Sequence, residues 1–280
     1  MTTTLQPTAA ISHRRRMLSK VPEVTLYFWI IKIMATTVGE TGADFLNTTL
    51  NFGLTDTTYI IGSLLLVGLF FQFRAQRYVP SLYWLCVVLI SVVGTLITDN
   101  LTDNFGVSLV TTTMVFAVLL GATFATWWAQ EKSLSIHSIS TLRREAFYWL
   151  AILFTFALGT AAGDLVAEGL SLGFWLSAVM FGALIALVAL AHYRFGLNAV
   201  LAFWIAYILT RPLGASLGDY LSQPAGDGGL GLGTVGTSAL FLTVILGVVT
   251  YLTRTRRDTA PLAPSTAIEA RRSTLVEPTA

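Results

Sequence analysis

Seven acidic residues recur at regular spacing along the chain, and their chemistry stands out from the rest of the sequence. They lie 11, 15 or 19 residues after a tryptophan, and a step of four residues keeps the acids of one stretch on one helical face. In chain order they are Glu40, Asp44, Asp99, Asp103, Asp164, Glu168 and Asp219. Carboxylate oxygens bind hard divalent cations and also accept protons. The pattern predicts a cation site, with the pairs Asp99/Asp103 and Asp164/Glu168 as first-choice ligands and the other three acids next.

The tryptophans belong to an internal repeat. A glycine follows each of them by ten residues and an aspartate follows the glycine by five, in four copies. The copies are Trp29, Gly39, Asp44; Trp84, Gly94, Asp99; Trp149, Gly159, Asp164; and Trp204, Gly214, Asp219. Four identical offsets indicate a tandem repeat. We expect the indole rings to anchor or pack the repeats, or to line the path of an organic cation.

The composition is that of a membrane protein. The chain is 54% hydrophobic and 11% charged, with a mean hydropathy of +0.70. Eight apolar runs are each about as long as a helix that crosses a bilayer. The expected spans are 22–47, 57–74, 80–102, 107–128, 146–168, 171–192, 198–222 and 233–253. The sequence therefore predicts an all-α polytopic membrane protein with eight transmembrane helices.

The basic residues predict the orientation of these spans. Lys and Arg precede the first span and follow each even-numbered span, whereas the connections from odd to even spans contain none. By the positive-inside rule, both termini are cytoplasmic.

Each repeat comprises two spans, so all four repeats share one orientation, and we expect parallel repeats in two pseudo-symmetric halves. The expected divisions are a cytoplasmic basic arm (1–21), a first half (22–130), a cytoplasmic linker (131–145), a second half (146–253) and a disordered cytoplasmic tail (254–280). The repeat glycines, each followed four residues later by Ala, Thr or Gly, are typical of closely packed transmembrane helices; a hinge or broken helix is the alternative.

Acidic side chains inside a bilayer must face protein, water or a cation. Only Lys32 and Arg211 offset the seven acids among the spans, which leaves five formal negative charges (seven minus two). Such a cluster must bind cations or hold protons. The alternative is that the acids cap helix ends in water outside the membrane. We expect Arg211 to be a built-in counter-ion or a structural ion-pair partner, and Lys32 to extend towards the cytoplasmic interface.

Other chemistry is disfavoured. His13, His137 and His192 lack metal-ligand spacing to another His or Cys, and the lone Cys86 forms no intramolecular disulfide. The residues before Asp164 and Asp219 do not match the Gly-x-Gly-Asp signature of intramembrane aspartyl proteases. We expect no enzyme activity, no cofactor and no nucleic-acid partner.

The repeated unit resembles a bacterial family of uncharacterised inner-membrane proteins built from four tandem two-helix repeats, each with a tryptophan. The resemblance covers residues 22–253 and depends on Trp29, Trp84, Trp149 and Trp204 with the Gly and Asp that follow them. It implies the architecture and a bacterial plasma-membrane location, but no chemistry.

The carboxylates therefore carry the functional expectation, which is secondary transport of a hard divalent cation such as Mn²⁺ or Mg²⁺, coupled to their protonation. The alternatives are a carrier of an organic cation or other small molecule and a membrane scaffold or signalling protein without transport. The expected partners are the cation, protons and the lipid bilayer.

Overall fold

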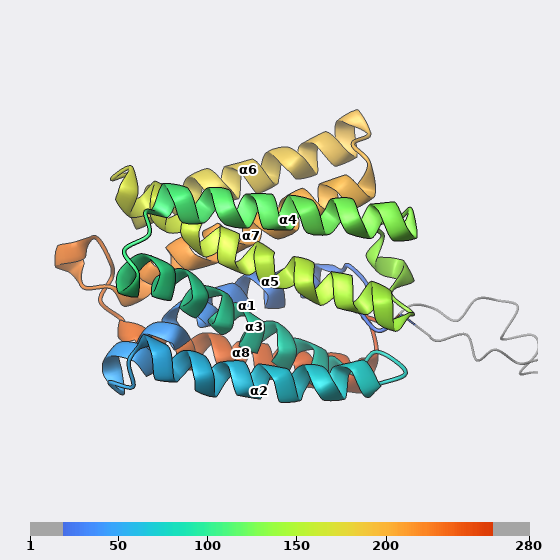
Figure 1. The fold of residues 1–280 in the computed structure, drawn as a ribbon, viewed down its shortest axis with the longest axis horizontal. Coiled ribbons are helices and arrows are strands. Elements are labelled where there is room, and N and C mark those ends of the chain that lie inside the picture. The colour runs from blue at the N-terminus through green and yellow to red at the C-terminus, as the bar shows by residue number, and fades with distance from the viewer. Residues whose placement is uncertain (1–18, 260–280) are drawn as a thin grey trace, which may run out of the picture.

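The computed structural model describes residues 19–259, which form eight α-helices and no strand (Figure 1). The helices are α1 (Leu26–Asp44), α2 (Leu54–Arg74), α3 (Pro80–Asp99), α4 (Leu109–Glu131), α5 (Leu142–Asp164), α6 (Phe174–Phe195), α7 (Ala199–Ser222) and α8 (Gly233–Thr255). Seven of them are long and apolar enough to cross a membrane. The exception, α1, carries the charged residues Lys32, Glu40 and Asp44.

Local sequence explains where several helices begin. The side chains of Thr25, Ser108, Thr141 and Asn198 each accept a hydrogen bond from a backbone N–H of the first helical turn. These caps satisfy donors that have no partner within the helix. Pro80 begins α3, at a position where a missing N–H costs nothing.

Three of the four odd-numbered helices continue as a five-residue π-helix directly after the repeat aspartate. These segments are Phe45–Thr49 after α1, Asn100–Asn104 after α3 and Leu165–Gly169 after α5. The fourth helix, α7, stays α-helical past Asp219 to Ser222. A π-turn uses i→i+5 hydrogen bonds, so four-residue spacing beyond the aspartate no longer defines one α-helical face.

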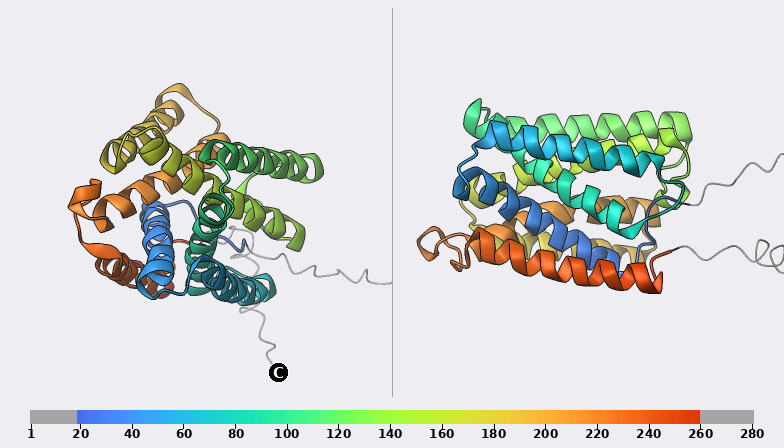
Figure 2. Two further views of the ribbon diagram at one scale, coloured as in Figure 1. Left: turned by 60° about the vertical axis from the view of Figure 1, so that its left-hand side comes forward. Right: turned by 90° about the horizontal axis from the view of Figure 1, so that it is seen from below.

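The odd-numbered helices form a closed ring at the centre. Helix α1 contacts α3, α3 contacts α5, α5 contacts α7, and α7 contacts α1. The even-numbered helices lie outside this ring, and each packs on the odd helix of the next repeat: α2 on α3, α4 on α5, α6 on α7, and α8 on α1 (Figures 1 and 2). The last repeat therefore closes onto the first.

The repeat glycines are the points at which the ring helices meet. A Cβ atom at Gly39 would lie 2.6 Å from the Cβ of Ser91, and one at Gly94 would lie 2.6 Å from the Cβ of Phe156. Gly159 packs in the same way on Arg211 of α7, and Gly214 packs on Thr36 of α1. Each glycine thus contacts the residue seven positions after the tryptophan of the next repeat. The packing interpretation of these glycines is confirmed.

The repeat tryptophans also join neighbouring repeats. Each indole ring packs on an aromatic residue of the preceding repeat, the one directly before that repeat's own tryptophan. The ring centroids are 5.5 to 6.3 Å apart. The pairs are Trp84 with Phe28, Trp149 with Tyr83, Trp204 with Tyr148, and Trp29 with Phe203. Trp84, Trp149 and Trp204 are buried. They hold the repeats together.

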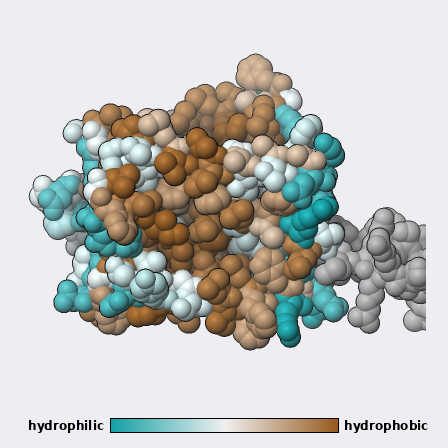
Figure 3. Space-filling view, in the orientation of Figure 1, coloured by the Kyte–Doolittle hydropathy of each residue, from teal (hydrophilic) through white to brown (hydrophobic). Residues whose placement is uncertain are grey.

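The two ends of the bundle differ. The odd helices begin at the end where the described chain starts and stops, which we call the basic end; the other, the acidic end, carries the π-helices and the odd-to-even connections. Hydrophobic surface fills the middle of the molecule and hydrophilic residues gather at both ends (Figure 3).

The connecting and terminal segments are more ordered than the sequence predicts. Helix α4 continues to Glu131 and α5 begins at Leu142, so the linker is shortened. Its backbone is bound by Arg144, which donates to the carbonyls of Ser133 and Ser135. The expected disordered tail (254–280) is wrong for residues 254–259, because α8 reaches Thr255 and Asp258 is buried. Residues 1–18 of the arm and 260–280 of the tail lie outside the described residues.

At the start of the described chain, Lys20 is also buried rather than part of a mobile arm. Its Nζ donates to Glu145 Oε2 at 2.7 Å and to the carbonyl of Phe73 at 3.0 Å. This ion pair ties the segment before α1 to the ends of α2 and α5.

Candidate functional site

Arg211 of α7 joins all four ring helices. Its guanidinium donates to the carbonyl of Thr36 on α1 at 2.6 Å and to Glu40 Oε2, also on α1, at 2.8 Å. It also donates to the hydroxyls of Thr95 on α3 and Thr160 on α5, the latter at 2.7 Å. The side chain is fully buried. Since an unpaired buried charge is costly, these contacts hold the ring in one arrangement.

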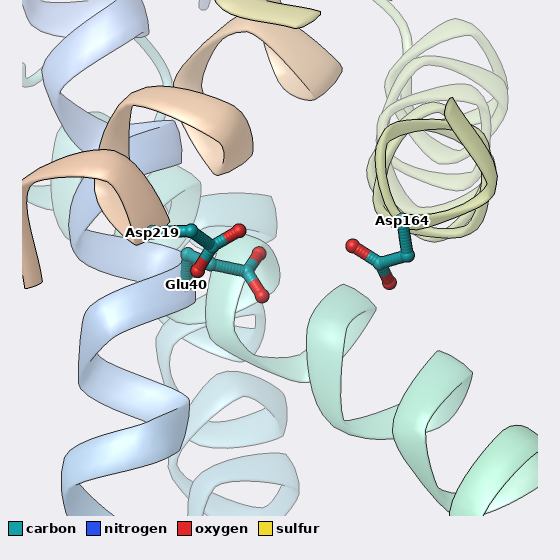
Figure 4. Close-up of side chains that lie close together, drawn as sticks. All are labelled: Glu40, Asp164 and Asp219. Atoms are coloured by element: carbon teal, nitrogen blue, oxygen red, sulfur yellow. The ribbon is translucent and has the colours of Figure 1, made fainter. Parts of the chain in front are cut away.

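Three carboxylates lie directly beside the Arg211 guanidinium. Glu40 of α1, Asp164 of α5 and Asp219 of α7 each offer one oxygen, and the three oxygens lie within 4.8 Å of one another. Glu40 and Asp219 lie side by side, and Asp164 faces them from the opposite helix (Figure 4). Glu40 and Asp219 are buried, and Asp164 is half-buried. We call Glu40, Asp164 and Asp219 the carboxylate triad.

The remaining predicted ligands lie outside this triad. Asp44 and Asp99 are half-buried, whereas Asp103 and Glu168 are exposed at the acidic end. Of the first-choice ligands, only Asp164 belongs to the triad. Of the predicted pair Asp164/Glu168 only Asp164 is in the triad, and neither Asp99 nor Asp103 is; the second acid of each pair lies in a π-helix. The acids therefore form a series from exposed at the acidic end to buried beside Arg211.

The expectation for Lys32 is wrong. Its side chain does not extend to the interface but is fully buried on the inner face of α1. The Nζ lies 3.8 Å from the centroid of the Phe156 ring and 4.2 Å from that of Tyr207, and it has no hydrogen-bond partner among residues 19–259. The rings supply cation–π contacts in place of an ion pair.

Trp29 borders a cavity of about 460 Å³ at the basic end, which the other three repeat tryptophans do not line. The cavity lies between α1, α6, α7 and the linker, and its lining is largely apolar, with His137 and His192. No acid of the triad lines it. The cavity and the carboxylate triad are therefore separate features of the molecule.

Sequence reasoning missed Thr95 and Thr160 as ligands of Arg211. Both lie eleven residues after the repeat tryptophan, the position that Glu40 occupies in the first repeat. That shared position was the available signal. It identifies side chains at the same height along the bundle, but not which of them Arg211 contacts, because contacts between helices depend on the rotation and spacing of the helices.

The helices and repeats described above define a helical membrane protein built from four copies of one unit. The chain belongs to the family described as Repeat of Unknown Function (DUF347), which matches residues 27–78, 82–133, 147–197 and 202–258. Each match begins within two residues of a repeat tryptophan. No curated protein and no solved structure matches the chain.

Proposed function

We propose that the protein is a secondary transporter of a hard divalent cation such as Mn²⁺ or Mg²⁺, coupled to proton movement. The observation that carries the proposal is the convergence of Glu40, Asp164 and Asp219 from three helices, with oxygens within 4.8 Å of one another. Oxygen ligands of this kind suit hard cations better than copper or zinc.

The local charge fits a divalent ion. Three carboxylates and the guanidinium that contacts one of them leave two formal negative charges (three minus one) when all are ionised. Lys32 lies eight residues before Glu40, about 12 Å along the helix axis. Arg211 is therefore the positive charge next to the triad. The remaining acids, from the half-buried Asp44 and Asp99 to the exposed Asp103 and Glu168, form an entry route for the cation from the acidic end.

In the membrane, we propose that all eight helices span the bilayer, with the basic end in the cytoplasm of a bacterial cell. Helix α1 carries three charged residues and still spans because they face the ring, where Glu40 has Arg211 and Lys32 has aromatic rings. The apolar band of Figure 3 supports this placement, as does the clustering of Lys and Arg at one end.

The test is Mn²⁺ uptake by proteoliposomes that contain a pH-sensitive dye. We expect the wild type to take up Mn²⁺ with movement of protons. Asp219→Asn should lower uptake at least about tenfold, since losing one charged ligand removes more than about 1.4 kcal/mol of cation binding. Asp56→Asn, at an exposed acid in the first turn of α2 that lies outside the triad and the entry route, is the matched control and should retain uptake.

Three results would contradict the proposal. Absence of uptake with every divalent cation favours a scaffold or signalling protein. Uptake of quaternary amines in place of metal ions favours an organic-cation carrier. Normal Mn²⁺ uptake by Asp219→Asn and by Asp164→Asn removes the triad from the mechanism.

A further inference from the structure

Buried polar groups continue from Arg211 towards the basic end, beyond anything that cation binding requires. Tyr207 of α7 and Lys32 of α1 both lie three residues after their repeat tryptophans, and both are fully buried. Neither the Tyr207 hydroxyl nor the Lys32 Nζ has a hydrogen-bond partner within the described part of the chain. Buried polar groups in native proteins are nearly always hydrogen-bonded to protein or to water, so these two call for bridging water.

One helical turn nearer the basic end, two further tyrosines meet at the axis. Tyr83 of α3 and Tyr148 of α5 each precede a repeat tryptophan, both are fully buried, and their hydroxyls share a hydrogen bond. Trp204 packs between this level and the level of Tyr207 and Lys32. Its ring centroid lies 6.3 Å from that of Tyr148 and 5.7 Å from that of Tyr207.

The series reaches the basic end through Tyr78. The Tyr78 ring packs on Tyr83 at 5.6 Å between centroids, and its hydroxyl donates to Asp258 Oδ2 at 2.6 Å. Burial, and then this hydrogen bond, raise the pKa of Tyr78 above its usual range, so its hydroxyl stays protonated and remains a donor. Asp258 follows α8 and is the last polar group of the series.

We propose that Lys32, Tyr207, Tyr148, Tyr83, Tyr78 and Asp258 form a proton column that connects the carboxylate triad with the basic end. This inference rests on the proposed function, because it supplies the route for the coupled protons. The triad itself is not part of the column, and a proton that moves between Lys32 and a triad carboxylate passes Arg211 and the ring of Phe156 through bridging water. Arg211 and the ring of Phe156, 5.6 Å from the guanidinium carbon, separate the two.

Protons pass along the column without net ionisation of any tyrosine. A hydroxyl oxygen accepts a proton from the neighbouring donor while its own O–H proton passes to the next acceptor, with water completing the links that lack a direct hydrogen bond. Lys32 releases one proton from its ammonium and takes up another on the resulting amine. Asp258 gains or loses one proton at the basic end.

The charged groups around the column do not interrupt it. Lys32 faces Arg211 and Tyr207 from α7 and Phe156 from α5. At the basic end the nearby acid Glu145 is bound to Lys20. The axis between Lys32 and Tyr83 contains hydroxyl groups and aromatic rings but no carboxylate among the contacts of the described residues.

The test is Tyr207→Phe in the full chain, which removes one hydroxyl and keeps the ring that packs on Trp204 and Lys32. We expect Mn²⁺ binding to the detergent-solubilised protein to be unchanged. Proton movement in Mn²⁺-loaded proteoliposomes should slow about tenfold, as for loss of about 1.4 kcal/mol of barrier stabilisation. Tyr220→Phe is the matched control, because Tyr220 also lies on α7 but packs on Trp175 of the outer helix α6; its rate should equal that of the wild type.

The outcomes separate this inference from the proposed function. Equal proton rates for Tyr207→Phe and the wild type overturn the column and leave cation transport intact. Mn²⁺ uptake by the wild type without any proton movement overturns the column and the proton coupling of the proposed function, and leaves only cation transport. Absence of Mn²⁺ uptake by the wild type overturns both. If Tyr207→Phe does not fold, Tyr83→Phe removes a hydroxyl at the next level, and an unchanged proton rate there overturns the column.

Discussion

Arg211 is the residue on which the centre of the molecule depends. The other three repeats have Thr36, Ser91 and Phe156 at the same distance from their tryptophans. Arg211 is therefore the one positively charged residue at this position of the repeat. The four repeats thus share a backbone arrangement and differ in the side chains that face the axis. This asymmetry gives a four-part ring a single ion pair between Arg211 and Glu40.

The cost of breaking that ion pair is a prediction at this scale. Arg211→Met leaves Glu40 buried without its partner, so the free energy of unfolding should fall by about 3–5 kcal/mol. The double variant Arg211→Met/Glu40→Gln should recover part of this loss because no lone buried charge remains. Thermal unfolding in one detergent measures both. Arg194→Met, at an exposed arginine, is the control. If Arg211→Met were as stable as the wild type, the contacts of Arg211 would not stabilise the fold.

At the scale of the element, the odd helices meet at the repeat glycines, and three of the four change their helix type after the repeat aspartate. The glycine brings each helix against the next one, and the aspartate five residues later lies where three of the four helices change to a π-helix. π-Helical turns are often found at functional sites, and here one of the three directly follows the triad acid Asp164.

Substitution of a ring glycine tests this packing. In Gly94→Ala the new Cβ would lie 2.6 Å from the Phe156 Cβ and 3.2 Å from the backbone nitrogen of Ala157, so α3 and α5 must separate. We expect a loss of about 1–3 kcal/mol in stability, the usual cost of overpacking. Gly121→Ala is the matched control, because a Cβ at Gly121 meets no atom within 4 Å in the described structure. Equal melting temperatures for the two variants would contradict close packing at Gly94.

At the scale of the whole molecule, closure of the ring gives the bundle two chemically distinct ends. The half-buried Asp44 and Asp99 lie at the acidic end, whereas tryptophans, tyrosines and the Lys20–Glu145 ion pair pack at the basic end. A cation entering from the acidic end reaches the triad before it meets Arg211. This order of groups fits the proposed transport of a cation from the acidic end.

Orientation in the membrane is testable by labelling in intact bacterial cells. In a Cys86→Ser background, Asp227→Cys at the acidic end should react with a membrane-impermeant maleimide. His137→Cys at the basic end should react only after the cells are opened. Both positions are exposed, so access to the reagent decides the outcome. The reverse labelling pattern would invert the proposed topology.

The sequence by itself determined the helices, the repeats and the membrane composition, because these depend on local periodicity and on the average polarity of a segment. It also identified the acids as the chemical groups of interest. Each expected span begins and ends within four residues of the observed helix, and the four family matches agree with the repeat. The π-helices were not predicted, since no simple periodicity distinguishes them from α-helix.

Only the tertiary structure decided which side chains meet. Glu40, Asp164 and Asp219 form the triad while Asp103 does not, although all four share the same four-residue spacing pattern. Lys32 turned out to be buried against Phe156, a residue from another repeat. The physical reason is that spacing along one helix defines a face, whereas the rotation and approach of neighbouring helices, set here by glycine contacts, determine what that face contacts.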